Sequence, residues 1–276
     1  MIIEYHRPTT LDQAMKLIVR TDPRTYPLGG GTVLNRPSPG RFAVVDLQAL
    51  GLNKIHKSGN NPSTGFRQAQ PASSGQRLEI GATATLQALL ESPHTSPALQ
   101  IAIKLETTFN LRQMATVAGT LVSCDGRSTF TTAMLVLDAK CSVISDQLWL
   151  RNRQPLSVIG LGDLLPLRTE LLRGKVITKI VIPLNVKLAF ETVARTPADK
   201  PIVCAAVAQW PSGRTRLALG GWGRSPVLAM DGSESGGVEE AAKNAFHEAG
   251  DEWASAEYRS EVAAVLAKRC LEKLES

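Results

Sequence analysis

The chain has 276 residues, of which 43% are hydrophobic and 20% are charged, so its composition is that of a globular protein of two or three small domains. The net charge is +6, but the absence of long Lys/Arg runs and the 5% aromatic content argue against a nucleic-acid-binding surface. Residues 1–5 do not open a signal peptide, and no apolar stretch is long enough to span a membrane. We therefore expect a cytoplasmic protein.

The first half of the chain alternates helical and extended patterns. Residues 8–20 place apolar side chains at helical spacing behind Thr9 and Thr10, either of which can cap the helix. Residues 58–77 are rich in Ser, Gly, Asn, Pro and Gln, which predicts a flexible hairpin loop. Further strands are predicted at 25–28, 42–47, 53–57 and 78–82, and helices at 85–91 and from 96 to 104.

The second half changes character after Pro183, where alternating antiparallel strands are followed by helices. We divide the chain near residue 176 and predict three parts: two subdomains at 1–57 and 58–176, and a C-terminal α+β domain at 177–276. The predicted strands are 141–144, 147–151, 177–182, 205–209 and 214–220, and the predicted helices are 133–139, 238–247 and 256–274.

The cysteines and histidines are not spaced as metal ligands. Cys124, Cys141, Cys204 and Cys270 form no C-x-x-C pair, and the four histidines are scattered along the chain. We therefore expect buried, reduced thiols and no metal site or iron–sulfur cluster held by this chain alone.

Two glycine-bearing segments carry the strongest functional signal. Residues 26–34 read Tyr-Pro-Leu-Gly-Gly-Gly-Thr-Val-Leu, and residues 116–121 read Thr-Val-Ala-Gly-Thr-Leu. Glycine lets main-chain N–H groups turn toward an anion, so two such turns brought together by folding can hold the two phosphates of a dinucleotide. Neither segment has the Rossmann or the P-loop pattern, and by itself the first is weak evidence that is better explained as a tight turn between strands.

The order and spacing of several segments resemble the flavin-binding medium subunits of the molybdenum hydroxylases, the xanthine dehydrogenase and carbon monoxide dehydrogenase family. The resemblance extends over essentially the whole chain, although no single motif is decisive. The similar segments are residues 5–14, 28–34, 78–86, 111–121, 193–199, 217–221 and 255–259.

The resemblance implies an α+β fold in which FAD lies between two subdomains of the vanillyl-alcohol oxidase type, followed by a small C-terminal domain of antiparallel sheet and helices. It implies that amides of residues 29–32 and 118–120 face the pyrophosphate, with the flavin ring near Ile177 and residues 195–201. The implied FAD-binding residues are Leu28, Gly29, Gly30, Gly31, Thr32, Val33, Leu34, Thr116, Ala118, Gly119, Thr120, Ser123, Asp125, Thr129, Ile177 and Lys200.

The sequence departs from the family pattern at several of these positions. Ala118 replaces a usual glycine, Thr120 a usual asparagine, and Thr129 an acidic residue that contacts the ribose or adenine end. Either Asp125 supplies that carboxylate from another place, or no carboxylate contact is made. Lys200 stands where an aromatic residue is frequent, and it either favours anionic reduced flavin or points to solvent.

The resemblance implies an oxidoreductase subunit that relays electrons and has no catalytic acid–base residue of its own. Its partners would be a large molybdenum-cofactor subunit and a small [2Fe-2S] subunit, with NAD as one candidate acceptor, in a dimer of heterotrimers. The competing hypothesis is a flavin-free structural or assembly subunit of the same kind of complex, which the altered second turn and the missing acidic residue favour.

Overall fold

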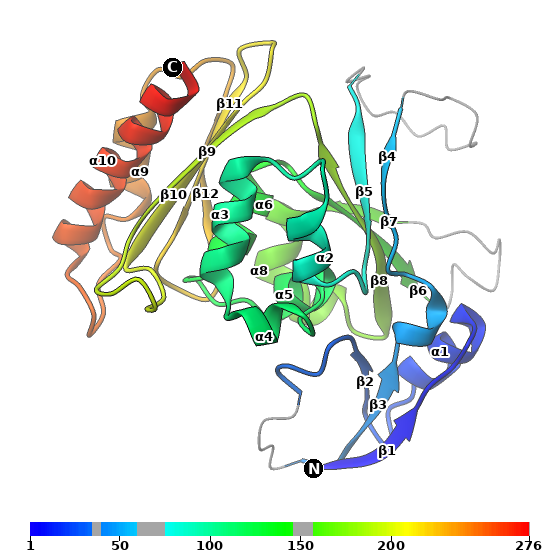
Figure 1. The fold of residues 1–276 in the computed structure, drawn as a ribbon. Coiled ribbons are helices and arrows are strands. Elements are labelled where there is room, and N and C mark those ends of the chain that lie inside the picture. Colours follow the sequence, from blue (N-terminus) through cyan, green and yellow to red (C-terminus); the bar gives the residue numbers. More distant parts are fainter. Residues whose placement is uncertain (35–39, 60–74, 146–156, 276) are drawn as a thin grey trace.

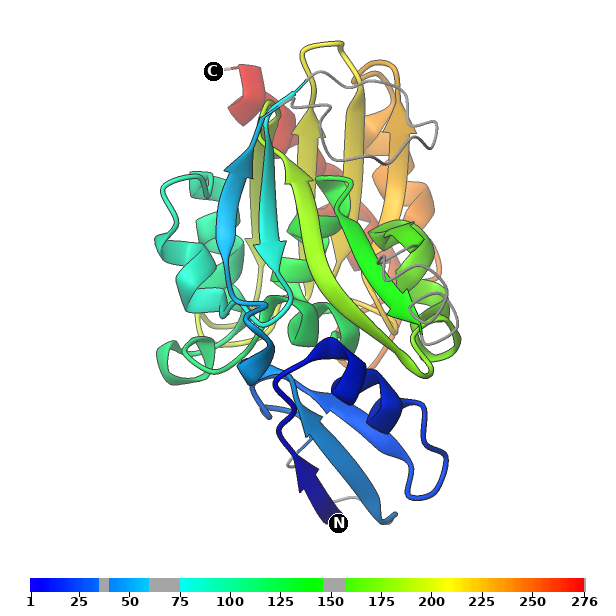
Figure 2. The ribbon, with the colours of Figure 1, turned by 90° about the vertical axis from the view of Figure 1, so that its right-hand side faces the viewer.

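A computed structural model describes residues 1–34, 40–59, 75–145 and 157–275 and shows three sheets joined in series (Figure 1). The first is a parallel sheet of order β1-β3-β2, which forms a small unit at the bottom of Figures 1 and 2. Its elements are β1 (Ile2–His6), α1 (Leu11–Ile18), β2 (Thr25–Leu28) and β3 (Phe42–Asp46). We call residues 1–46 the N-terminal unit.

Helix α1 begins where its sequence predicts, because the Thr10 side chain accepts a hydrogen bond from the main-chain N–H of Gln13. Its apolar face, which includes Ile18, packs on β3 and also on Ile144 and Val176 of the next sheet. The N-terminal unit is thereby joined to the rest of the molecule through a hydrophobic cluster.

The second sheet has five strands in the order β4-β5-β8-β6-β7, and every neighbouring pair is antiparallel. Helices pack between this sheet and the third one (Figure 1). After the short helix η1 (Gln48–Leu50), the strands are β4 (Ile55–Ser58), β5 (Arg77–Gly81), β6 (Lys140–Ser145), β7 (Ser157–Gly160) and β8 (Lys175–Pro183). The helices are α2 (Leu86–Glu91), α3 (Pro97–Glu106), α4 (Phe109–Arg112), α5 (Val117–Ser123), α6 (Thr129–Val136) and α8 (Leu161–Leu171).

The third sheet is antiparallel with order β12-β11-β10-β9, and two helices cover its outer face. Along β10 successive side chains alternate between its faces: Val203 and Ala205 pack toward α10, whereas Cys204 and Ala206 pack toward α6. The elements are β9 (Lys187–Val193), β10 (Val203–Gln209), β11 (Thr215–Gly220), β12 (Val227–Gly232), α9 (Val238–Ala245) and α10 (Ala256–Glu275).

The predicted fold class is confirmed, since helices and sheets are mixed and the chain ends in an antiparallel sheet with helices. The sequence did not predict β1, β9, β12 or α8. The predicted strand 147–151 and most of the predicted loop lie outside the described residues, although β4 and β5 pair as a hairpin. The predicted division near residue 176 falls inside β8, which pairs with both β5 and β6.

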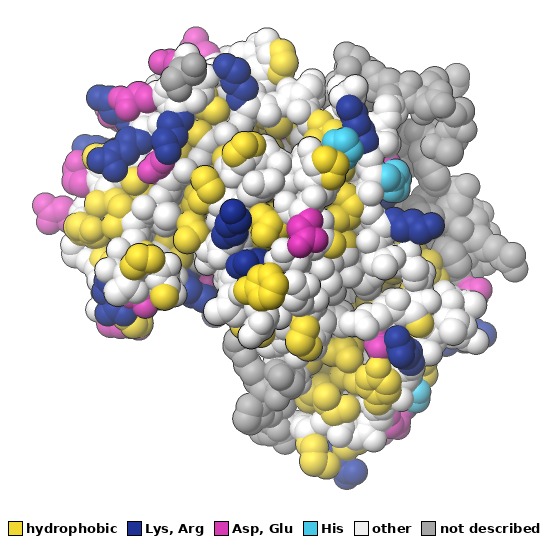
Figure 3. Space-filling model, viewed as in Figure 1, with side chains coloured by type: hydrophobic (Ala, Val, Ile, Leu, Met, Phe, Trp, Pro, Cys, Tyr) yellow, Lys and Arg dark blue, Asp and Glu magenta, His cyan; other side chains and the backbone are white. Residues whose placement is uncertain are grey.

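On the face seen in Figure 3, basic and acidic side chains are interspersed and do not gather into a patch of one sign. In the described part of the chain, no helix combines the length and the apolar character needed to cross a membrane.

One buried arginine holds the segment between α9 and α10. Arg259 is fully buried, and its guanidinium donates hydrogen bonds to the carbonyl oxygens of Ile202, Ala249 and Ala254 and to the carboxylate of Asp251 at 2.7 Å. The charge is therefore compensated inside the protein, and one side chain joins β10 to the turn before α10.

Replacing Arg259 by methionine removes the guanidinium donor from the buried carbonyl groups of Ile202 and Ala249, whereas Asp251 and Ala254 keep main-chain N–H donors. We expect the R259M variant to lose about 3–5 kcal/mol of unfolding free energy, measured by chemical denaturation. The exposed Arg269 on the same helix provides the control, because R269M removes a similar side chain from solvent and should change stability by less than about 0.5 kcal/mol. Equal losses in the two variants would contradict this role for Arg259.

Candidate functional site

The glycine segment after β2 lies directly against the residues that precede α5. A Cβ atom on Gly30 would lie 1.7 Å from the carbonyl oxygen of Met114, and one on Gly29 would lie 2.5 Å from Oγ1 of Thr116. Both distances are far shorter than a normal contact, so positions 29 and 30 require glycine. The two glycine-bearing segments of the sequence are therefore neighbours in space.

Residues 29–32 present an open run of main-chain donors. Within the described ranges, no group accepts a hydrogen bond from the main-chain N–H of Gly29, Gly30, Gly31 or Thr32. Gly31 adopts a left-handed backbone conformation with φ +69°. Unpaired amides that follow one another through such a bend form a concave site for an anion.

The second glycine segment is the first turn of helix α5 and not a turn between strands. Thr116 caps this helix, since its Oγ1 accepts from the N–H of Gly119 at 3.1 Å. The N–H of Ala118 donates to Ala82 at 3.2 Å, and that of Thr120 donates to the Thr116 carbonyl at 2.9 Å. The amides that the sequence suggested as phosphate donors here already have acceptors within the chain.

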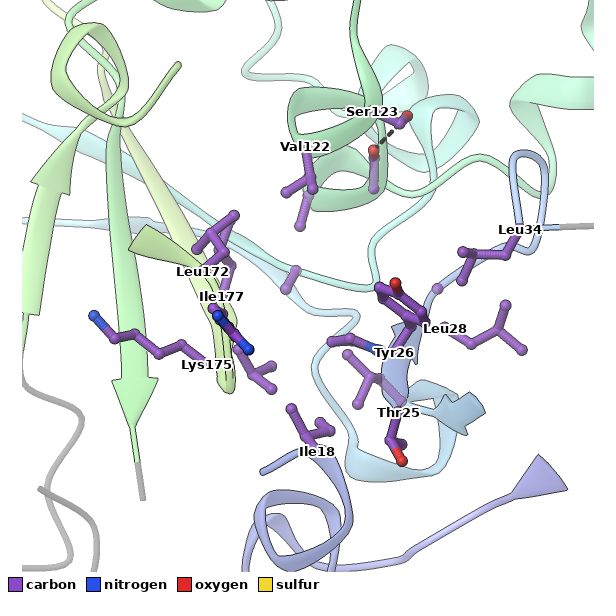
Figure 4. A pocket seen from close by; sticks show the side chains of 18 of the residues that line it. Ile18, Thr25, Tyr26, Leu28, Leu34, Val122, Ser123, Leu172, Lys175 and Ile177 are labelled. Carbon is purple, nitrogen blue, oxygen red and sulfur yellow. Dashed lines mark hydrogen bonds between the residues drawn. The ribbon is translucent and has the colours of Figure 1, made fainter. Parts of the chain in front are cut away.

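A cavity of about 1090 Å³ lies beside the two segments, between the N-terminal unit and the five-stranded sheet. Figure 4 shows Tyr26 and Leu28 on one side, Ile177 on the other, Val122 above and Ile18 below. Small-molecule sites commonly have volumes of about 300–1,000 Å³, so this cavity has the size of a site for a large cofactor.

The cavity lining is basic and rich in hydroxyl groups, and the described lining residues include no Asp or Glu. The basic residues are Arg20, Arg24, Arg168, Arg173 and Lys175. The hydroxyl-bearing residues are Thr21, Thr25, Tyr26, Thr32, Thr83, Thr116, Ser123, Ser145 and Thr169.

The protein neutralises little of this positive charge. Arg20 pairs with Glu4 at 3.1 Å, and in the described parts of the chain no other lining cation has a carboxylate within 4.0 Å. Arg168 instead donates to the carbonyl oxygens of Cys124 and Arg224, at 2.9 and 3.0 Å. The electrostatic field in the cavity therefore favours an anionic ligand.

Most of the residues predicted to bind the cofactor line this one cavity. They come from β2 and the glycine segment, from α5 and from β8, which are remote in sequence. The predicted residues that line the cavity are Leu28, Gly29, Gly30, Gly31, Thr32, Val33, Leu34, Thr116, Ala118, Gly119, Ser123 and Ile177.

Thr120 and Thr129 do not line the cavity, and their hydroxyl groups form hydrogen bonds inside the protein. The Oγ1 of Thr120 donates to the carbonyl of Thr116, and that of Thr129 donates to Ala102 at 2.7 Å. Thr129 also contacts Glu106, whose carboxylate accepts from the first turn of α6 and whose pKa is raised by burial. Thr129 thus belongs to the contact between α3 and α6.

Asp125 and Lys200 also lie off the cavity lining and pair with each other at 2.5 Å. Arg127 fixes this region by donating to the main-chain carbonyl of Lys200 at 2.7 Å. Most of residues 195–201, expected beside the flavin ring, line a separate pocket of about 250 Å³. The structure therefore does not bring this segment together with Ile177.

Sequence reasoning missed one wall of the cavity and several hydroxyl-bearing residues. Arg168, Thr169 and residues 172–176 line the cavity from the end of α8 to the start of β8, and α1 contributes Ile18. Thr83 lines it too, and its buried Oγ1 has no hydrogen-bond partner in the described structure. No pattern in the sequence marks these residues, because only tertiary packing places them at the cavity.

The fold is shared with chains in structures of CO dehydrogenase and quinoline 2-oxidoreductase. The chain matches one in reconstituted CO dehydrogenase from Oligotropha carboxidovorans with a TM-score of 0.76 at 22% identity, covering 99% of this chain and 97% of that one. For quinoline 2-oxidoreductase from Pseudomonas putida 86, the TM-score is 0.71 at 21% identity, with coverages of 99% and 96%. At such identities the likeness shows the fold.

Sequence comparison assigns the family. The chain is 24% identical to a relative from Escherichia coli strain K12, the uncharacterized protein YgfM, over 96% of this chain and 94% of the relative. Residues 1–185 match the family described as the FAD binding domain in molybdopterin dehydrogenase. The resemblance, the cofactor FAD and the oxidoreductase class predicted from the sequence are confirmed at this level. The chain belongs to the family of FAD-binding domains of molybdopterin dehydrogenases.

Proposed function

We propose that this chain is the FAD-carrying electron-transfer subunit of a multi-subunit molybdenum hydroxylase, and that the described cavity holds the FAD. The observation that carries the proposal is the run of unpaired amides at residues 29–32 beside a basic cavity without carboxylates. A diphosphate is the part of FAD that needs both features. The glycines at positions 29 and 30 let this segment lie directly against Thr116 and Met114, which places its amides beside the cavity.

The residues of the chain bind and orient the cofactor. The N–H groups of residues 29–32 donate to the diphosphate, and the lining arginines add attraction over a longer range. Apolar side chains such as Ile177 and Val122 exclude water from the ring system. Bound FAD supplies a reversible electron carrier, and no acid–base side chain of this chain is required for that chemistry.

The proposed place of this chain is between two partners and an acceptor. A large subunit with the molybdenum cofactor oxidises the substrate, and a small subunit with [2Fe-2S] clusters delivers electrons to the FAD, which passes them to an acceptor such as NAD. In the described ranges no group of three His, Cys, Asp or Glu side chains can hold a metal, which supports this division of labour. We further propose a dimer of heterotrimers in the cytoplasm.

The central test is flavin binding by the purified full chain. We expect FAD to bind near stoichiometrically, and to bind at least about tenfold more tightly than FMN or riboflavin, because those ligands lack the diphosphate. Flavin absorption after gel filtration and titration of flavin fluorescence measure both quantities. Denatured protein that releases no flavin after reconstitution would support the flavin-free structural subunit instead.

A Gly30→Ala variant tests where the diphosphate lies. The new Cβ would overlap the Met114 carbonyl, so the glycine segment must move and its amides lose their alignment. We expect FAD affinity to fall at least about tenfold, with a loss of about 1–3 kcal/mol of stability from the overlap. Gly40→Ala is the matched control, because nothing lies within 4 Å of its Cβ. FAD affinity equal to wild type in G30A would place the diphosphate elsewhere.

The proposed partners are tested by co-expression with the neighbouring reading frames. We expect a complex whose visible spectrum contains iron–sulfur absorption together with about one flavin per copy of this chain. Addition of substrate should then reduce the flavin, and NAD should reoxidise it if NAD is the acceptor. A complex that forms without flavin would contradict the relay and support an assembly role.

A further inference from the structure

Thr83 carries a hydroxyl group that has no hydrogen-bond partner in the part of the chain that the structure describes. The residue follows β5, is 7% exposed, and lines the large cavity together with Ala82 and Ala118. Its Oγ1 is buried and has no hydrogen-bond partner among the described residues. A buried polar atom without a partner is destabilising, so this hydroxyl group calls for an explanation.

The main chain around Thr83 is fixed from two sides. The N–H of Thr83 donates to Leu52 at 2.9 Å. The carbonyl groups of Ala82 and Ala84 accept from Ala118 and Val117 in the first turn of α5, at 3.2 and 2.8 Å. Thr83 is therefore held at the start of the helix that lies against the glycine segment.

The other unpaired buried atoms differ in kind. They are two guanidinium nitrogens of Arg216, and Arg216 has the carboxylates of Asp138 and Asp231 within 4.0 Å. Thr83 has a neutral hydroxyl group with no hydrogen-bond partner among the described residues, and valine would fill nearly the same volume without a polar atom. Folding alone therefore does not account for a threonine at position 83.

We propose that Thr83 is a cofactor-binding residue whose hydroxyl group donates a hydrogen bond to a diphosphate oxygen of the FAD. The inference rests on the proposed function, because it takes the ligand of the cavity to be FAD. Rotation between staggered χ1 positions presents the hydroxyl group in place of the methyl group without moving the main chain. A hydrogen bond to a charged oxygen then compensates the burial of the group.

A Thr83→Val variant gives two effects of opposite sign. Without ligand, valine removes the unpaired hydroxyl group and keeps the volume, so the melting temperature of the apoprotein should rise by about 2–4 °C. With ligand, the hydrogen bond is lost, so the dissociation constant of FAD should increase about tenfold or more. Thr83→Ser retains the hydroxyl group and should keep an FAD affinity close to that of wild type.

Thr129→Val is the matched control, because the Thr129 hydroxyl is also buried but donates to Ala102 and lies off the cavity. We expect T129V to lower the melting temperature of the apoprotein and to leave FAD affinity unchanged. Scanning calorimetry of the apoprotein and flavin fluorescence titration supply the two readouts for all variants.

The outcomes separate this inference from the proposed function. If wild type binds FAD and T83V binds it with the same affinity, the role of Thr83 is overturned while the proposed function stands. A melting temperature of apo T83V below that of wild type also overturns it, since the hydroxyl group then has a partner without FAD. A wild-type chain that binds no FAD overturns both.

Discussion

The contact between the glycine segment and the residues before α5 is the constraint on which the site depends. The N-terminal unit touches the rest of the molecule there, where Gly30 meets Met114, and again where α1 packs on Ile144 and Val176. The cavity lies between these two contacts, since its lining includes both Ile18 of α1 and the glycine segment. Any side chain at position 30 would remove one support and change the shape of the cavity.

The two glycine-bearing segments have different tasks. Helix α5 supports the first segment, because the Thr116 hydroxyl that caps the helix lies against Gly29. The amides of Ala118, Gly119 and Thr120 form hydrogen bonds within the chain. The first segment carries the unpaired amides. Departures from the family pattern at 118 and 120 therefore fall on residues whose main-chain groups serve the fold, which makes them less damaging to anion binding than the sequence suggests.

The sequence predicted elements with strong local patterns and the pairing of the two glycine segments. The alternation of side chains along β10 and the apolar face of α1 follow from local sequence patterns. The glycines at positions 29 and 30 reflect the close approach of this segment to the residues before α5. Strand β1 was missed because it is short and has no buried residue, and α8 because it contains Pro166. The cavity wall formed by Arg168, Thr169 and residues 172–176 and the unpaired Thr83 hydroxyl arise from tertiary packing, which no local pattern encodes.

At positions 129 and 200 the sequence departs from the family pattern, and the groups proposed to bind FAD lie closer to the N-terminal unit as a result. Thr129 is committed to Ala102, and Lys200 is paired with Asp125, so neither group is offered to the cavity. Among the described residues, the run of unpaired main-chain donors beside the cavity lies on the glycine segment, which belongs to the junction between two units. A ligand held there contacts both units at once, and its binding free energy stabilises the way the N-terminal unit is seated. Under the proposed function, binding of the cofactor and docking of the N-terminal unit are then thermodynamically linked. The contact between Gly30 and Met114 preorganises the site before the ligand binds.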